Sequence, residues 1–503
     1  MKRSKFSLSN YKLCSLNMGD LVPVGLTEVL PGDTIQQATG VLLRASPLVA
    51  PVMHPCRVRV HHWYVPNRII WEDWEDFITG GPDGNDASVY PTITFSGGSG
   101  AATGSLADYL GVPTGVDGIE VSALPFRAYA LIWNEWYRDQ DLATELTVDI
   151  TSGADTTTDT DLQKCAWERD YFTISRPWEQ KGPAISLPLG TEAPITGLYA
   201  RGTGGESATS LAHDYWDSAG NNVNPVVGNN NWVDVAAIAT QTTGAVGSGN
   251  LPQVKADLSN ATAASINDLR EAFGLQRYEE ARARYGSRYT EYLRYLGVRS
   301  SDARLQRPEY LGGGRATLQF SEVLQTAPDD ATNPVGQLKG HGIAALRSNR
   351  YRRFIEEHGW ILSTISVRPK TIYMDGLQRH WNRRTKEDFW QKELQHIGQQ
   401  EILNKEVKAG HATPEGVFGY GDRYDEYRHQ WSSISGEFRE STLDFWHFGR
   451  QFATDPALNE TFIECVPPET PFAITTQDQL YAMVNHSIQA RRFVAKTGSS
   501  FIY

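Results

Sequence analysis

Basic residues interleaved with aromatic ones give the strongest chemical signal in this sequence of 503 residues. One such run surrounds Tyr351 and contains Arg347, Arg350, Arg352 and Arg353, with no acidic residue before Glu356. Guanidinium groups pair with phosphates, and aromatic rings stack on unpaired bases, so the run predicts a contact with single-stranded DNA. The same side chains are equally suited to salt bridges and stacking between protein chains, and the sequence leaves both interpretations open.

Two further basic segments could serve the same chemistry. Arg379, Arg383, Arg384 and Lys386 surround His380 and Trp381, and Lys2, Arg3 and Lys5 could reach DNA as a flexible N-terminal arm. The whole chain is acidic, however, with 59 Asp and Glu against 47 Lys and Arg and a net charge of −12. A protein that coats nucleic acid over its entire surface is usually basic. Any contact with DNA is therefore expected to be local and confined to one face.

Histidines and carboxylates were considered as metal ligands or catalytic groups. His54, Cys56, His61 and His62 are close in sequence, but His61 and His62 would point to opposite faces of a strand and so could not easily share one ion. A structural or interface role is expected for them. The acidic cluster Trp71–Asp76 fits a solvated helix face better than the paired carboxylates of a glycosidase. Residues Asp155–Asp161 lack the Gly and Glu of a calcium-binding loop.

Glycine-rich segments do not match known cofactor motifs. Gly312–Arg315 lacks the GK[ST] ending of a phosphate-binding loop, and Gly202–Gly205 is not a dinucleotide fingerprint. The serine-hydrolase motif G-x-S-x-G is also missing from the sequence. We therefore predict that the protein is not an enzyme and has no catalytic residues, bound metal or cofactor.

The cysteines and the N-terminal segment indicate the cellular compartment in which the chain folds. Its four cysteines are widely spaced and predict free thiols in a reducing cytoplasm: Cys14, Cys56, Cys165 and Cys465. No apolar segment follows the basic N-terminus, and no run of 18 apolar residues occurs, so neither a secretory signal nor membrane insertion is expected.

The elements that must position these residues are mostly strands. Residues 57–65 alternate between two faces, 360–373 are rich in Ile, Val and Thr, and 491–494 form a last strand candidate. Helices are expected at 68–79, 125–140, from Ile266 after an N-cap at Ser265, and at 385–397. Many short strands with very long connections favour a mainly β, jelly-roll or Greek-key sandwich over an α/β fold.

One long segment has a different composition. Residues 190–262 are rich in Gly, Asn, Ala and Thr and carry six acidic and two basic residues. Their periodicity is weak, which is typical of disorder or of a functional excursion from a compact fold. Trp216 and Trp232 lie within this segment.

Short motifs in a specific order extend over nearly the whole chain, except residues 190–262 and smaller loops. They include Met18–Pro23, Pro47–His54, Trp74–Gly81, Leu124–Tyr129, Trp133–Gln140, Arg169–Thr173, Pro308–Gly313, Ser366–Thr371 and Thr442–His447. In these motifs the chain resembles the major capsid proteins of the Microviridae, most closely those of the gokushovirus branch.

This resemblance implies a single eight-stranded jelly-roll sandwich over residues 1–503, with long inserted loops and a few short helices. It implies that about 60 copies assemble in the bacterial cytoplasm into a T=1 virion shell around circular single-stranded DNA, without catalysis. It also implies a protrusion used in host attachment, which we assign to residues 190–262 with Trp216 and Trp232. Expected partners are a small basic DNA-packaging protein, a minor or pilot protein and a host receptor.

A carbohydrate-active protein, either a lectin or a glycosidase, is the alternative from another functional class. Jelly rolls host such proteins too, and a fold alone does not decide function. The 14 Trp residues would suit stacking on sugars. The ordered motifs favour the capsid interpretation.

Overall fold

The computed structural model describes residues 3–82, 85–98, 100–183, 185, six residue pairs between 195 and 256, 266–285, 306–324 and 337–496. The chain divides into two compact units. The first contains Met1–Glu179 and Arg282–Tyr503, and the second contains Gln180–Ala281.

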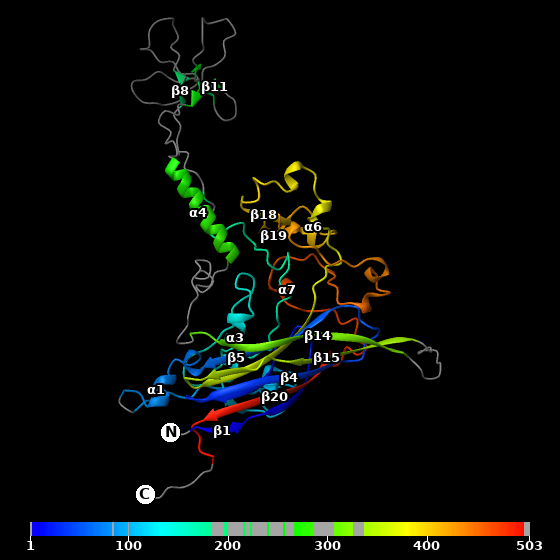
Figure 1. Ribbon diagram of the computed structural model, residues 1–503. Helices are drawn as coiled ribbons and strands as arrows, with labels where there is room; N and C mark the ends of the chain where they lie inside the picture. Colours follow the sequence, from blue (N-terminus) through cyan, green and yellow to red (C-terminus); the bar gives the residue numbers. More distant parts are fainter. Residues whose placement is uncertain are drawn as a thin grey trace, which may run out of the picture. The chain divides into compact units, whose positions relative to one another are not determined.

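A ten-stranded antiparallel sheet dominates the first unit (Figure 1). Along the sheet the strands follow the order β1-β20-β4-β15-β14-β5-β17-β3, with β2 also beside β20 and β16 also beside β4. Their bounds are β1 Ser4–Ser7, β2 Asn10–Leu16, β3 Val22–Val29, β4 Thr34–Ala45, β5 Cys56–Pro66, β14 Glu309–Leu324, β15 Leu338–Arg347, β16 Tyr351–Phe354, β17 Gly359–Pro369 and β20 Leu480–Arg492.

The ten strands occupy eight positions across the sheet, because β1 and β2 share one position and β15 and β16 share another. Strands β1 and β2 pair with successive parts of β20, and β15 and β16 pair with successive parts of β4. Strand β14 pairs with β5 through its first half and with β15 through its second half, so the sheet curls over on itself. The resulting layers, β2-β20-β4-β15 and β3-β17-β5-β14, have the strand order of a jelly roll. The predicted mainly β fold is confirmed.

The core lies between the two layers. Inward side chains from both contribute to it, among them Val41, Leu43, Val58, Val60, Ile365, Ala482 and Val484. In β20 every second residue from Leu480 to Ala490 is buried and its neighbours are exposed. The other side chains of each layer consequently point away from the sandwich.

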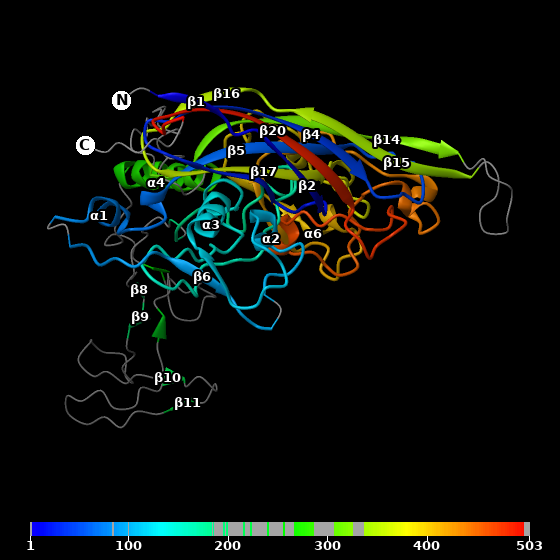
Figure 2. The same cartoon turned by 90° about the horizontal axis from the view of Figure 1, so that it is seen from below.

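A second core covers the outer side of the β5–β17 layer. Helix α3, Leu124–Trp136, packs there, and its residues Phe126 and Tyr129 share this core with Trp63 and Leu362. In Figure 2, α2 and α3 lie on one side of the sheet, and the opposite side is formed by β1, β4, β16 and β20. The predicted helix 125–140 is thus confirmed, although it ends four residues earlier.

Shorter elements complete the described residues. In the first unit these are η1 Asn67–Ile69, α1 Trp74–Thr79, α2 Leu106–Leu110, β6 Thr92–Phe95, β7 Ile119–Ser122, η2 Arg379–Trp381, η3 Lys386–Asp388, β18 Gln399–Leu403, α6 Asn404–Val407, β19 Val417–Asp422, η4 Asp425–Tyr427, η5 Gly436–Arg439, η6 Asp444–Trp446 and α7 Glu460–Ile463.

The second unit holds three antiparallel pairs of two-residue strands, β8 Ile195–Thr196 with β13 Lys255–Ala256, β9 Leu198–Tyr199 with β12 Ala239–Thr240, and β10 Tyr215–Trp216 with β11 Asn222–Val223. Helix α4, Ile266–Tyr285, starts where the sequence predicts; its expected cap Ser265 lies outside the described residues.

Two predicted helices differ from the structure. The helix predicted at 68–79 is split into η1 and α1, because the backbone N–H of Glu72 donates to the carbonyl of Ile150 rather than to a helical partner. Only η3 forms within 385–397, so that prediction is wrong. There the N–H groups of Trp390 and Gln391 donate to the hydroxyls of Tyr427 and Tyr424, which replaces helical hydrogen bonds.

Two strands were also mispredicted. The last strand, predicted at 491–494, is β20 and begins at Leu480. The glycines Gly312–Gly314, for which no strand was predicted, lie inside β14. A β-bulge between Tyr310 and Gly312 interrupts the pairing with β5, and Gly312 has a φ of +148°, which favours glycine.

Candidate nucleic-acid interface

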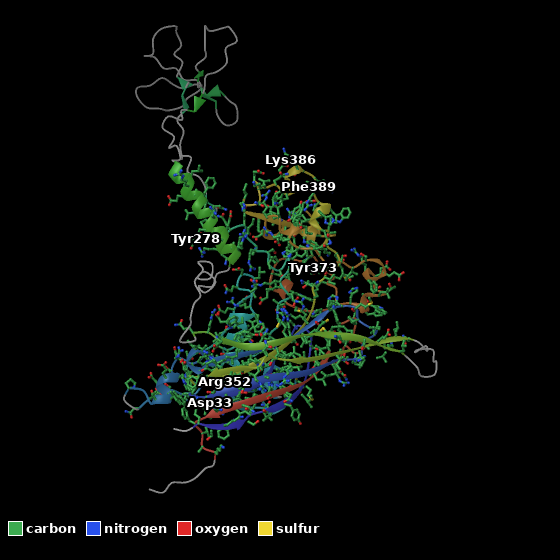
Figure 3. All side chains as sticks on the ribbon, in the orientation of Figure 1. Asp33, Tyr278, Arg352, Tyr373, Lys386 and Phe389 are labelled. Atoms are coloured by element: carbon green, nitrogen blue, oxygen red, sulfur yellow. The ribbon has the colours of Figure 1, made fainter. Side chains whose placement is uncertain are left out.

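Strand register brings several basic residues together at one end of the outer face of the β20–β4 layer. Lys5 of β1 lies directly opposite Arg491 of β20, which in turn lies opposite Thr34 of β4. On the other side of β4, Arg352 of β16 pairs with Gln36. Figure 3 labels Arg352 at this end of the sheet. Residues more than 480 positions apart in the chain therefore become neighbours.

These residues surround a hollow of about 570 Å³, which we call the basic hollow. Its lining consists of Arg3, Ser4, Lys5, Thr34, Arg352, Arg491 and Lys496. Five of the seven are cationic and none is acidic. Like charges directly opposite on a sheet repel each other, and this applies to Lys5 and Arg491. The hollow is therefore suited to an anion such as a phosphate.

Arg3 is fixed in the wall of the basic hollow. Its Nη1 donates to the carbonyl oxygen of Gly32 at 3.0 Å and to Oγ1 of Thr34 at 3.1 Å. The guanidinium also lies over the rings of Phe354 and Phe493, at 5.5 and 5.7 Å from their centroids. Both rings are about half exposed, so they offer stacking surfaces beside the cations. Arg3 is held by the fold and is not a free arm.

The other predicted DNA-binding arginines are distributed differently. Arg347 ends β15 opposite Gly40 and is exposed on the same face as the basic hollow. Arg350 is exposed in the connection to β16. Arg353 instead forms an ion pair with Glu309, at 3.0 Å between Nη2 and Oε1. Its charge is thus already compensated within the chain, and Lys2 lies outside the described residues.

The second basic run is also paired within the chain. Arg379 donates to Glu406 at 3.1 Å, and Arg383 lies 3.5 Å from Glu426. Lys386 and Phe389 sit in the loop region near β18, away from the labelled Arg352 (Figure 3). Arg379 and Arg383 thus form salt bridges within the chain, and their contact with DNA or with a second chain stays a prediction. Sequence reasoning missed Arg491 and Lys496 at the hollow; an alternating pattern from 480 to 491 was the signal that could have placed Arg491 on the exposed face.

The histidines and cysteines considered as ligands have separate partners. His54 Nε2 contacts the carbonyl oxygen of Lys370 at 2.6 Å, His61 Nδ1 contacts the hydroxyl of Tyr137 at 2.6 Å, and His62 Nδ1 contacts Ser363 at 2.8 Å. Within the described ranges, no three His, Cys, Asp or Glu side chains are grouped to hold a metal ion. All four cysteines are free thiols, as predicted. None of the described helices has the length and apolar character needed to span a membrane.

The predicted attachment residues are only partly described. Trp216 ends β10, but its side chain is outside the described residues, and Trp232 lies outside them entirely. The assignment of residues 190–262 to host attachment therefore stays a prediction.

Comparison with known proteins identifies the family. The model of the family described as capsid protein (F protein) matches residues 1–501. The chain belongs to this phage capsid family. It is 39% identical to capsid protein VP1 of Bdellovibrio phage phiMH2K, over 95% of this chain and 90% of that protein. It is 33% identical to capsid protein VP1 of Chlamydia phage 1, over 93% and 90%, and 33% identical to that of Spiroplasma virus 4, over 92% and 87%.

These relatives confirm the predicted relationship to the gokushovirus capsid proteins of the Microviridae. The chain is a major capsid protein of a small phage, a structural and non-enzymatic component of the virion shell that self-assembles. This family membership favours the capsid interpretation over the carbohydrate-active alternative.

Proposed function

We propose that about 60 copies of this capsid protein close into a T=1 shell around circular single-stranded DNA, with the basic hollow facing the genome. The observation that carries the proposed DNA contact is the basic hollow itself. Five cationic side chains meet on one exposed sheet face of a chain whose net charge is −12. A charge distribution of this kind suits an acidic protein that contacts nucleic acid on one side only.

Within this proposal, Arg3, Lys5 and Arg352 bind DNA phosphates together with Arg491 and Lys496. Arg347 and Arg350 extend the contact along the same face, and Lys2 adds to it at the N-terminus. Arg353 contributes less, because Glu309 already pairs with it. Since the subunit is acidic overall, we propose that a small basic packaging protein neutralises most of the remaining phosphate charge.

We further propose that residues 190–262 attach the virion to a receptor on the bacterial host, with Trp216 and Trp232 supplying apolar contact area. Aromatic side chains of this kind are enriched in protein interfaces. The shell would be assembled in the host cytoplasm together with a minor or pilot protein. The free state of all four cysteines is compatible with a reducing compartment.

The mass of the purified particle tests the shell. About 60 subunits of 56.0 kDa give a protein shell of about 3.4 MDa, so light scattering should find uniform particles of this mass plus that of the enclosed DNA, with closed shells in negative-stain images of the same fraction. A chain that stays monomeric even when it is co-produced with the other proteins of its phage would contradict the proposal.

A further inference from the structure

A second arginine-rich hollow lies on the outer side of the other layer, and we call it the arginine hollow. It has a volume of about 590 Å³ and lies beside β5, β17 and α3. Three carboxylates line it, from Glu135, Asp139 and Glu168. Six guanidinium groups also line it, from Arg57, Arg59, Arg138, Arg169, Arg307 and Arg368. Positive charge therefore exceeds negative charge in its wall.

The sheet register places these arginines directly against one another. Arg57 of β5 is the register partner of Arg368 of β17, and Arg59 of β5 is the partner of Arg315 of β14. Directly opposed like charges destabilise a sheet. Glu168 bridges Arg57 and Arg59, at 2.8 and 3.1 Å, and so compensates part of this charge. Of the four opposed guanidinium groups, those of Arg57 and Arg59 contact this carboxylate, while Arg368 donates to the carbonyl oxygen of Ala166 at 2.6 Å.

The pKa values of two groups in the arginine hollow reflect this crowding of positive charge. Burial, followed by the charge of Arg368, lowers the pKa of Arg59, although Glu168 acts in the opposite direction. Burial together with Arg59 and Arg368 lowers the pKa of His61 to about 4, so its imidazole is neutral at pH 7. An anion that enters the arginine hollow would relieve this repulsion.

In the proposed shell, the arginine hollow does not face the genome. Val58 and Val60 of β5 point into the core shared by the two layers, so Arg57 and Arg59, which alternate with them, point away from it. The cations of the basic hollow point away from the same core on the opposite layer. In a closed shell, DNA that lies against one outer face of the sandwich does not lie against the other.

We propose that the arginine hollow receives a carboxylate-bearing segment of a second copy of this chain during shell assembly. This inference rests on the proposed shell. Each copy carries 59 acidic side chains against 47 basic ones, so neighbouring subunits supply carboxylates in excess. Trp136 lines the hollow, is 37% exposed, and has Arg307 over its ring at 5.3 Å. Tryptophan and arginine are both enriched among the residues that contribute most of the binding energy at protein interfaces.

Paired variants on the two faces test this inference. The double variant Arg57→Ala, Arg368→Ala should lower the yield of closed shells by at least about tenfold, because each lost contact recurs around the whole shell. The few shells that form should contain normal amounts of DNA. The matched control Lys5→Ala, Arg491→Ala should form shells in normal yield with less DNA. Normal shell yield from the Arg57, Arg368 variant, or shells that lose DNA, would overturn the inference.

A crosslinking experiment avoids dependence on the folding of that variant. Arg169 is exposed at the hollow, so Arg169→p-benzoylphenylalanine places a photoreactive group there in an otherwise intact shell. Irradiation should produce covalent dimers of the chain, and peptide mapping should find the second end in an acidic surface segment. Crosslinks to DNA, or no crosslinks between chains, would overturn the inference. If the unsubstituted chain forms no shell at all, the proposed function fails instead.

Discussion

The guanidinium of Arg127 donates from Nε to Oδ2 of Asp155 at 2.8 Å, and both side chains are completely buried. Arg127 also donates to the carbonyl oxygens of Ile70 and Thr151, at 3.1 and 3.0 Å. The pair thus ties α3 to two loops beneath the β5–β17 layer. This pair was not predicted from the sequence, because Arg127 and Asp155 lie 28 positions apart in the chain.

Removal of one partner of this pair should be strongly destabilising. In Arg127→Met the carboxylate of Asp155 loses its counter-charge inside the core, and the free energy of unfolding should fall by roughly 3–5 kcal/mol. Denaturant unfolding followed by tryptophan fluorescence measures this change. The control Arg428→Met removes an exposed guanidinium paired with Asp425 and should cost at most about 1 kcal/mol. Equal effects of the two substitutions would contradict the role of the buried pair.

Two histidines buried inside the sandwich predict that stability falls in acid. His62 contacts Ser363, while His486 contacts Thr39 at 2.9 Å and the carbonyl oxygen of Val24 at 3.0 Å. Burial lowers the pKa of His62 to about 3 and also lowers the pKa of His486. The folded state therefore keeps both neutral, whereas the unfolded chain binds protons below about pH 6.5. Stability is complete above that pH and is lost as the pH falls towards 3.

For His62 alone, the loss in the free energy of unfolding should reach about 2 kcal/mol at pH 5. His62→Asn keeps a polar side chain that does not titrate, so the variant should be less stable at pH 7 but lose about 2 kcal/mol less between pH 7 and 5. Unfolding curves at the two pH values give the difference. The exposed His396→Asn serves as the control. An unchanged pH dependence in His62→Asn would exclude this histidine as the acid-sensitive group.

The basic hollow predicts how binding of single-stranded DNA depends on salt. The triple variant Lys5→Ala, Arg352→Ala, Arg491→Ala removes up to three phosphate contacts, so the slope of log affinity against log salt concentration should fall in magnitude by about 2. Fluorescence anisotropy of a labelled oligonucleotide with purified subunits measures the slope. Arg353→Ala is the matched control, since Glu309 already pairs with Arg353. If the control changes the slope as much as the triple variant, the hollow is not the binding site.

Residues 190–262 predict a separation of assembly from attachment. A variant in which a short Gly-Ser linker replaces this segment should still form shells, because the jelly-roll strands lie outside it. Its particles should not adsorb to host cells. Particle counts and adsorption assays on the same preparation measure the two properties. Failure to assemble would show that the segment contributes to the shell itself, and normal adsorption would exclude it from attachment.

Close packing around the glycines of β14 predicts a local steric effect. A Cβ atom at Gly313 would lie 2.2 Å from the carbonyl oxygen of Val60, so Gly313→Ala must displace backbone. We expect a loss of about 1–3 kcal/mol in unfolding free energy. A Cβ at Gly410 would meet nothing within 4 Å, which makes Gly410→Ala the control, with little change expected. A neutral Gly313→Ala would mean that β14 can shift away from β5.

The sequence predicted those parts of the fold in which local pattern and tertiary environment agree. The side chains of residues 57–65 alternate between two environments, because one face of β5 packs in the sandwich core and the other faces α3. This pattern predicted the strand correctly. Gly312–Gly314 carry no such pattern, because a Cβ atom at Gly313 would strike β5, one at Gly314 would strike the backbone of Ser348, and Gly312 has a positive φ. The basic hollow depends on register between β1, β4, β16 and β20. Sequence proximity suggested Arg353 as a site residue and could not reveal its pairing with Glu309.

The position of β20 has a consequence for biosynthesis. This strand, at residues 480–492, lies between β2 and β4, which leave the ribosome long before it. Until residue 492 has been translated, the backbone edges of both early strands lack their partner in this sheet. The subunit can thus complete this sheet only after residue 492 has been translated. Until then, the unpaired strands of nascent chains need protection from one another on the polysome.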